Sequence, residues 1–169
     1  DINGYYTDHH HDDRYYTKNQ TYTKNEIDNA VGPTPKVLSL GAIDFQPVSH
    51  SADLAYGYAL PGGVRVDAGG AFFNAGLRLP VGSTITGVQV FLDPNGVSRS
   101  ASLHRYRPLG PVSERLGNGS STGGNVSEAI ELGVDHTVEA GWNYRIDDIL
   151  LIAGGAILYG AEISYLPPP

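Results

Sequence analysis

The middle of the chain reads Thr84-Ile85-Thr86-Gly87-Val88-Gln89-Val90-Phe91-Leu92 and continues into Asp93-Pro94-Asn95-Gly96. In the first part, apolar residues alternate in part with polar Thr86 and Gln89, which predicts a strand. In the second part, proline presets φ and Asn-Gly supplies positive φ, which predicts a turn. A strand that ends in a tight turn is typical of an antiparallel sheet.

The same pattern recurs on both sides of this stretch. Ser100–Arg107 alternates cleanly, and 22 glycines and 11 prolines supply turns between short strands. No alternation of strands with helices is present, so a doubly wound fold is not expected. We therefore predict an all-β fold, an antiparallel β-sandwich resembling a jelly roll with about eight strands. The further predicted strands are Val37–Phe45, Phe72–Leu79, Val126–Leu132, Tyr144–Ile152 and Ala156–Leu166.

Composition excludes several classes of function. The 169 residues carry a net charge of −7, which argues against nucleic acid as a partner, because such binding needs clustered Lys and Arg. Cysteine is absent, so disulfides, thiol nucleophiles and Cys-type zinc sites are excluded. No apolar run approaches the ~20 residues that span a bilayer, so no membrane insertion is expected.

The first 36 residues differ in chemistry from the rest. They hold all three lysines, Lys18, Lys24 and Lys36, and they repeat Tyr16-Thr17-Lys18-Asn19 as Tyr22-Thr23-Lys24-Asn25. Repeats this short need stacking neighbours or other chains to bury a core, although a polar linker is the alternative. We predict a repeat-containing stalk and linker over 1–36, with a hinge at Gly32-Pro33-Thr34-Pro35, and a β-sandwich head over 37–169.

The tract from His9 to Lys18, with Tyr22-Thr23-Lys24-Asn25-Glu26-Ile27-Asp28 after it, resembles the tyrosine-threonine-lysine repeats of tailed-bacteriophage tail fibres. The second region resembles, more loosely, the small β-sandwich heads that cap such fibres. The stretch Leu79–Val88 also resembles one found in uncharacterised bacterial secreted proteins. The fibre resemblance implies a homotrimer that attaches to cells; a monomeric sandwich is the alternative.

His9, His10 and His11 form the densest group of potential metal ligands. On an extended strand His9 and His11 would lie on one face, because side chains alternate with period two. Around a threefold axis they would supply six nitrogens, an octahedral set suited to iron or another transition metal. Some phage fibres hold iron in this way, so the resemblance supports His9 and His11 as ligands. A solvated polar turn or a residual affinity tag is the alternative.

Catalytic patterns are poor. Ser49, His50 and Asp53 lie in one loop without a nucleophile elbow. Asp147-Asp148 with Glu128 and Glu131 could be a glycosidase pair, but exposed carboxylates at strand ends are the preferred interpretation. We expect no enzyme.

Binding is better supported by the sequence. Sugar sites often combine an aromatic platform with carboxylate and amide groups. Trp142 with Tyr144 and Asp147 is one candidate, and Tyr56 with Tyr58, in a predicted loop over Ala55–Ala59, is another. Each of these is also typical of a structural residue. The Gly- and Ser-rich loop from Arg107 to Asn125 is a candidate recognition loop.

These observations lead to one expected function and two alternatives. We expect a non-enzymatic, homotrimeric fibre head, in a virion or extracellular, that attaches to a glycan or protein receptor at a cell surface. Three weak sites on one fibre would gain from effective concentration. The alternatives are a structural subunit or trimerisation cap of a virion or appendage, and a secreted carbohydrate-binding module.

Overall fold

The structure is a computed structural model, and it describes residue 23 and residues 32–50, 52–59, 62–110 and 112–169, with the backbone alone at 49 and 50. The only helical element of these described residues is one 3-10 turn, η2 (Ala42–Asp44). The described strands are β1 (Lys36–Gly41), β2 (Gln46–His50), β3 (Ala55–Ala59), β4 (Gly63–Ala68), β5 (Gly70–Leu77), β6 (Thr84–Asp93), β7 (Ser100–Tyr106), β8 (Ser113–Ser120), β9 (Glu128–Leu132), β10 (His136–Thr137), β11 (Asn143–Ile152) and β12 (Ile157–Leu166).

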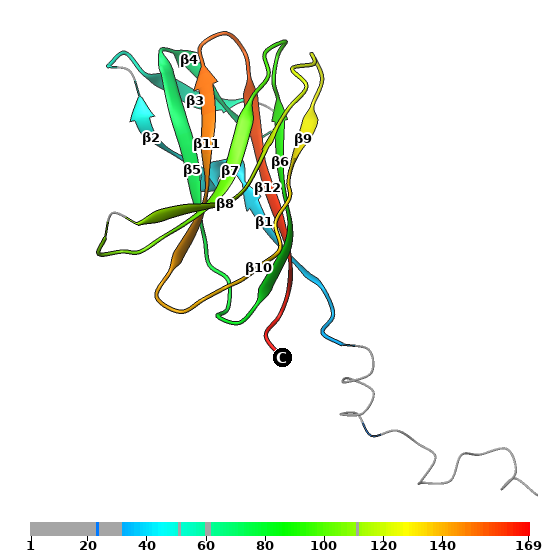
Figure 1. Cartoon of the computed structure of the whole chain (residues 1–169). Helices are drawn as coiled ribbons and strands as arrows, with labels where there is room; N and C mark the ends of the chain where they lie inside the picture. The colour runs from blue at the N-terminus through cyan, green and yellow to red at the C-terminus, as the bar shows by residue number, and fades with distance from the viewer. Residues whose placement is uncertain (1–22, 24–31, 51, 60–61, 111) are drawn as a thin grey trace, which may run out of the picture. The chain divides into compact units, whose positions relative to one another are not determined.

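The strands form two sheets that face each other (Figure 1). The seven-stranded sheet has the order β10-β6-β12-β4-β3, with β9 also pairing with β6 and β1 also pairing with β12. The five-stranded sheet has the order β2-β5-β11-β7-β8. Every strand pair is antiparallel. The predicted all-β, antiparallel sandwich is therefore confirmed.

The core lies between the two sheets and is built by alternation along the strands. In β6, Ile85, Val88, Val90 and Leu92 are fully buried, as the pattern of this stretch predicts. The opposite sheet contributes Phe73, Leu103, Ile146 and Ile149, and all belong to one continuous cluster. At roughly 1.5–3 kcal/mol for each large apolar side chain, this burial is the main favourable term in folding.

Two glycines close one side of the sandwich by letting β8 pass directly over β9. A Cβ on Gly119 would lie 2.2 Å from the Glu131 carbonyl oxygen, and one on Gly117 would lie 2.8 Å from that of Gly133. Only a residue without a side chain allows this backbone-to-backbone approach. The last strand of the five-stranded sheet is therefore fixed against the strand that borders β6 in the other sheet.

Several details of the sequence prediction are wrong. The described residues hold twelve strands where about eight were expected. The stretch Ala55–Ala59 is the edge strand β3 and not a loop, and β8 occupies the centre of the predicted loop from Arg107 to Asn125. The first strand ends at Gly41, because Asp44 accepts a hydrogen bond from the Gly41 amide at 2.8 Å and sets the 3-10 turn.

The N-terminal predictions lie outside the described residues. The chain divides into two units, Asp1–Thr34 and Pro35–Pro169, and all the described strands belong to the second. The stalk repeats and the metal ligands His9 and His11 therefore remain predictions, as does the homotrimer. Within the described part of the chain, no helix is long and apolar enough to cross a membrane.

Candidate functional site on the five-stranded sheet

A bulge in the central strand β11 turns two carboxylates to the outer face of the five-stranded sheet. The register of β11 against β5 shifts between Ile146 and Ile149, both of which are buried in the core. Asp148 has φ of 62°, a conformation that few non-glycine residues adopt. The expectation of exposed carboxylates at strand ends is wrong here: Asp147 and Asp148 lie mid-strand, and Asp147 is 8% exposed.

The carboxylate of Asp148 is held by neighbours through one oxygen only. Ser102 donates its hydroxyl proton to Oδ2, His104 Nε2 lies 3.2 Å from Oδ2, and Arg115 Nη2 lies 4.0 Å from it. The second ring nitrogen, Nδ1 of His104, is 3.3 Å from Ser113 Oγ. Among the described residues no group bonds to Oδ1 of Asp148, so this oxygen is available to a donor from a ligand.

These contacts keep Asp148 ionised. Burial opposes ionisation, but the hydrogen bond from Ser102 and the interactions with His104 and Arg115 outweigh it, so the pKa of Asp148 is lowered. Asp147 is neutralised separately, because Arg145 Nη2 lies 2.6 Å from its Oδ2. Arg145 also lies over the Tyr106 ring, with 5.1 Å between its Cζ and the ring centroid. The exposed anionic acceptor of this face is thus Asp148.

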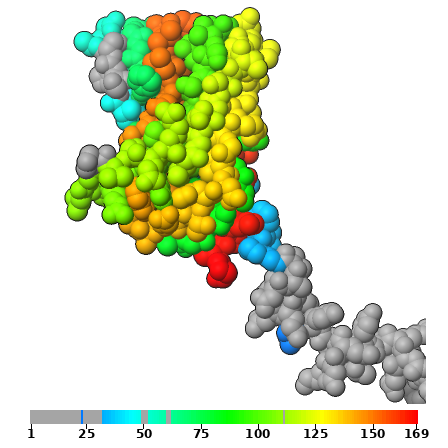
Figure 2. Space-filling model, in the orientation of Figure 1, coloured from blue at the N-terminus to red at the C-terminus, as the bar shows by residue number. Residues whose placement is uncertain are grey.

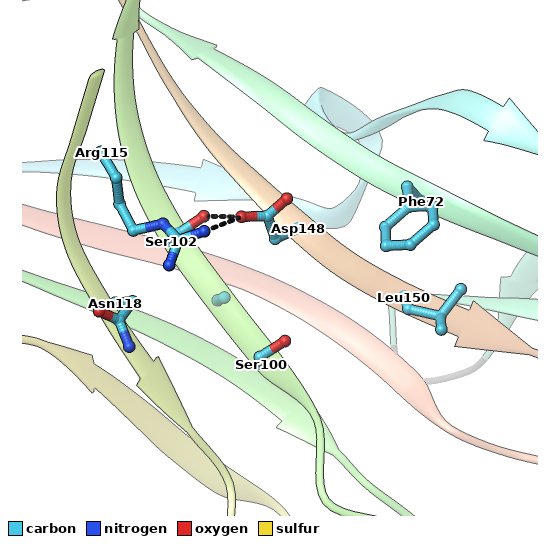
Figure 3. A pocket seen from close by; sticks show the side chains of 8 residues that line it. Phe72, Ser100, Ser102, Arg115, Asn118, Asp148 and Leu150 are labelled. Atoms are coloured by element: carbon cyan, nitrogen blue, oxygen red, sulfur yellow. Dashed lines mark hydrogen bonds and ion pairs between the residues drawn. The ribbon is translucent and has the colours of Figure 1, made fainter. Parts of the chain in front are cut away.

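A pocket of about 330 Å³ opens beside Asp148 on this outer face. Figure 3 shows Arg115 and Asn118 on one side of it, Phe72 and Leu150 on the other, and Asp148 between them. Its wall comes from β5, β11, β7 and β8, neighbouring strands whose spacing of about 4.8 Å makes a strip of ~14 Å. Figure 2 views this outer face, with atoms of β5, β11 and β7 following one another across its upper part.

The pocket combines an apolar platform with polar groups that have few partners of their own. Phe72 is 39% exposed although it is a large apolar residue, and Leu150 lies beside it. The side chains of Ser100 and Asn118 form no hydrogen bond within the described part of the chain, and Arg115 has only its 4.0 Å contact. No group of three or more His, Asp or Glu among the described residues suits a metal ion.

The structure places the predicted Trp142 group in a different setting. Trp142 packs partly buried against the core, and the guanidinium groups of Arg105 and Arg107 lie 4.2 and 4.9 Å from its ring centroid. Tyr144 is buried, with its hydroxyl 2.9 Å from the Glu139 amide and 3.1 Å from His136 Nε2. Since Asp147 lies on the outer face, the three predicted residues do not share one surface.

Arg105 organises this group. It pairs with Glu114 at 2.7 Å and with Glu139 at 2.6 Å, and hydrogen bonds to these carboxylates raise its pKa above the usual range. The pKa of Glu139 is lowered by the same contact with Arg105. Arg105 thus joins β7, β8 and the segment before β11 around Trp142, which is a structural arrangement.

The second predicted pair, Tyr56 and Tyr58, lies on the edge strand β3. The two residues are 42% and 60% exposed, and they lie on the same face of the strand because they are two positions apart. The Tyr56 ring meets core residue Phe73 edge-on, with 5.8 Å between ring centroids. This pair remains a predicted second binding surface.

The candidate glycosidase carboxylates are not brought together. Glu128 accepts hydrogen bonds from Thr122 and Gly124, which lower its pKa, and Glu131 accepts one from Gln89 at 2.6 Å. Both glutamates lie on β9 in the seven-stranded sheet, whereas Asp147 and Asp148 lie on the other sheet. Of Ser49 and His50, only the backbone is described, on β2.

Most residues of the pocket cannot be predicted from the sequence. Phe72, Ser102, Arg115 and Asn118 come from three strands, and a single sequence does not show which positions of different strands lie opposite each other. One signal was present: Phe72 and Phe73 are consecutive in a predicted strand, so one of the two rings had to face outward.

Comparisons with known proteins give structural similarities alone. No family model matches the chain, and neither does any curated protein. The C-terminal family 6 carbohydrate-binding module of a laminarinase from Zobellia galactanivorans is 17% identical, with 76% of this chain and 98% of that one covered and a TM-score of 0.45. A GH26-CBM35 β-(1,4)-mannanase from Podospora anserina is 14% identical, with 80% and 28% covered and a TM-score of 0.45. Tailspike protein 4 of bacteriophage CBA120 is 12% identical, with 78% and 19% covered and a TM-score of 0.43.

Proposed function

We propose that this chain is a non-catalytic β-sandwich that binds a glycan on the outer face of its five-stranded sheet. The observation that supports this most directly is the pocket at Asp148, where an ionised carboxylate with an unused oxygen faces the exposed ring of Phe72. A sugar ring offers a face of C–H groups to an aromatic ring and hydroxyl donors to a carboxylate.

The two kinds of contact are sufficient for a weak, specific site. A hydrogen bond to a charged group contributes about 1.5–3 kcal/mol, and the aromatic contact adds roughly 0.5–1.5 kcal/mol. Asp148 needs no rearrangement to accept a donor, because Ser102 and His104 already fix its other oxygen. A preorganised acceptor reduces the entropy that binding loses.

The biological role that we propose for this glycan site is attachment to a cell surface. The N-terminal tyrosine repeats support a trimeric fibre component, and three sites on one fibre would convert weak contacts into firm attachment. The proposed location is extracellular or on a virion. A glycan or a glycan-bearing protein at the cell surface would be the receptor.

The test is binding of the intact chain to a broad immobilised glycan panel, followed by the Phe72→Ala variant on every glycan that binds. We expect Phe72→Ala to weaken binding about tenfold, the equivalent of roughly 1.4 kcal/mol. Ile43→Ala is the matched control: Ile43 is also an exposed apolar residue, at 68%, but it lies on the 3-10 turn η2 and does not line the pocket. If no glycan binds, or if both variants bind as the parent chain does, the proposal is wrong.

A further inference from the structure

The pocket has an excess of unused hydrogen-bond donors at one end. Arg115 and Asn118 both lie on the edge strand β8, and Arg115 has a side chain that is 58% exposed. Among the residues that the structure describes, its only ionic contact is the 4.0 Å approach to Asp148, whose Oδ2 already accepts a hydrogen bond from Ser102 and contacts His104. The Asn118 amide makes no hydrogen bond within the described residues.

The contact with Asp148 does not satisfy the hydrogen-bonding capacity of the Arg115 guanidinium. A guanidinium carries five N–H donors in a planar fork that matches a carboxylate with two parallel hydrogen bonds, and a 4.0 Å contact uses none of them well. Arg65, by contrast, forms a close pair with Asp67 at 2.7 Å. Arg145, which lies in the central strand of the same sheet, is also paired closely, with Asp147 at 2.6 Å.

We infer that the glycan recognised here carries an anionic group, a carboxylate or sulfate, which Arg115 receives with help from Asn118. This inference rests on the proposed function and deepens it. In this arrangement the ligand has a hydroxyl for Asp148 Oδ1, an apolar face for Phe72, and a negative group directed at β8. The chain's net charge of −7 does not oppose this, since charges more than a Debye length of about 8 Å away are largely screened at physiological salt.

The experiment uses matched acidic and neutral sugars with the full chain. Oligogalacturonate is compared with its carboxyl-reduced form, 3′-sialyllactose with lactose, and a sulfated galactan oligosaccharide with its desulfated form, all by isothermal titration calorimetry. In any pair that binds, we expect the acidic member to bind about tenfold tighter at low salt, with the difference shrinking in 0.5 M NaCl.

Variants locate the effect. Arg115→Gln should remove the tenfold preference, so that the acidic and neutral members bind it equally, whereas Arg115→Lys should keep part of the preference through its charge. Arg65→Gln is the matched control, because Arg65 is also exposed but lies on the other sheet. This variant should keep the affinities of the parent chain for both the acidic and the neutral sugar. Thermal melting confirms that each variant is folded.

The outcomes separate this inference from the proposed function. Equal or tighter binding of the neutral member would overturn the inference while leaving glycan binding in place. A preference for acidic sugars that survives Arg115→Gln would also overturn it. Failure of every sugar to bind, in these pairs and in the broad panel, would remove both.

Discussion

His104 and Asp148 are joined across β7 and β11, with 3.2 Å between the imidazole Nε2 and the carboxylate Oδ2. Ser113 lies 3.3 Å from the other ring nitrogen, so the imidazole is held at both ends. The contact fixes one oxygen of Asp148 and leaves the other without a hydrogen bond from any described residue. The position of this carboxylate depends on the bulge in β11, which also requires the positive φ of Asp148.

Two substitutions of Asp148 distinguish the effect of its charge on binding from the effect of its positive φ on stability. Asn tolerates the left-handed conformation, whereas Ala is strained there by roughly 1–2 kcal/mol. We expect Asp148→Ala to lower the free energy of unfolding by about 1 kcal/mol more than Asp148→Asn, measured by urea denaturation. Both variants should lose about tenfold in glycan affinity. Equal stability of the two variants would show that the bulge is not strained.

Stability should depend on pH through His136. Burial, and then the nearby charge of Arg105, lowers the pKa of His136. The Tyr144 hydroxyl oxygen accepts a hydrogen bond from the Glu139 amide. The hydroxyl hydrogen of Tyr144 is then free to form a hydrogen bond to Nε2 of neutral His136. As the pH is lowered, His136 of the unfolded chain takes up a proton at about pH 6.5, and His136 of the folded chain does so only at a lower pH. The free energy of unfolding therefore falls as the pH drops below about 6.5.

The matched variant for this pH effect is His136→Gln, which cannot titrate. We expect its melting temperature to fall less between pH 7 and pH 5 than that of the parent chain, with both scanned in the same buffers. Parallel curves for the two proteins would show that His136 does not contribute to the acid response.

The closure of the sandwich at β8 and β9 can be tested with single methyl groups. Gly119→Ala places a Cβ 2.2 Å from the Glu131 carbonyl oxygen, so the strands must separate, and we expect a loss of about 1–3 kcal/mol in the free energy of unfolding. Gly76→Ala in β5 is the control: a Cβ there meets no atom within 4 Å. Its stability should be unchanged or slightly higher, since Ala reduces the entropy of the unfolded chain.

The group around Trp142 should be more important for stability than for binding. Arg105→Ala removes two ion pairs and the guanidinium over the indole ring, so we expect a lower melting temperature with unchanged glycan affinity per folded molecule. Tryptophan fluorescence reports the change directly, because Trp142 is the single tryptophan. A loss of glycan affinity without loss of stability would show instead that the Trp142 group takes part in glycan binding.

The homotrimer is tested by the solution mass of the intact chain, measured by light scattering after size exclusion. The fibre hypothesis predicts three times 18.0 kDa, and elemental analysis of that trimer then tests a metal at His9 and His11. A mass of one chain would contradict both, and would favour a monomeric carbohydrate-binding module.

Local patterns predicted most of the fold, and contacts between strands account for what they missed. Thr84–Leu92 and Ser100–Arg107 form β6 and β7 within one residue, because their alternation matches the pleat. Strand β8 was missed because Gly117 and Gly119, which serve close packing on β9, resemble turn residues in the sequence. The same limit applies to the site: a bulge at Asp147-Asp148 depends on register against two neighbouring strands, which no single strand encodes.

Glycan binding at the Asp148 pocket is tested most directly by backbone NMR during titration with a glycan that binds in the panel. The amide shifts should move in one group that includes Phe72, Ser100, Asn118 and Asp148, on four neighbouring strands of the five-stranded sheet. Shifts gathered instead around Tyr56 and Tyr58, or around Trp142, would contradict this account and place the site elsewhere on the sandwich.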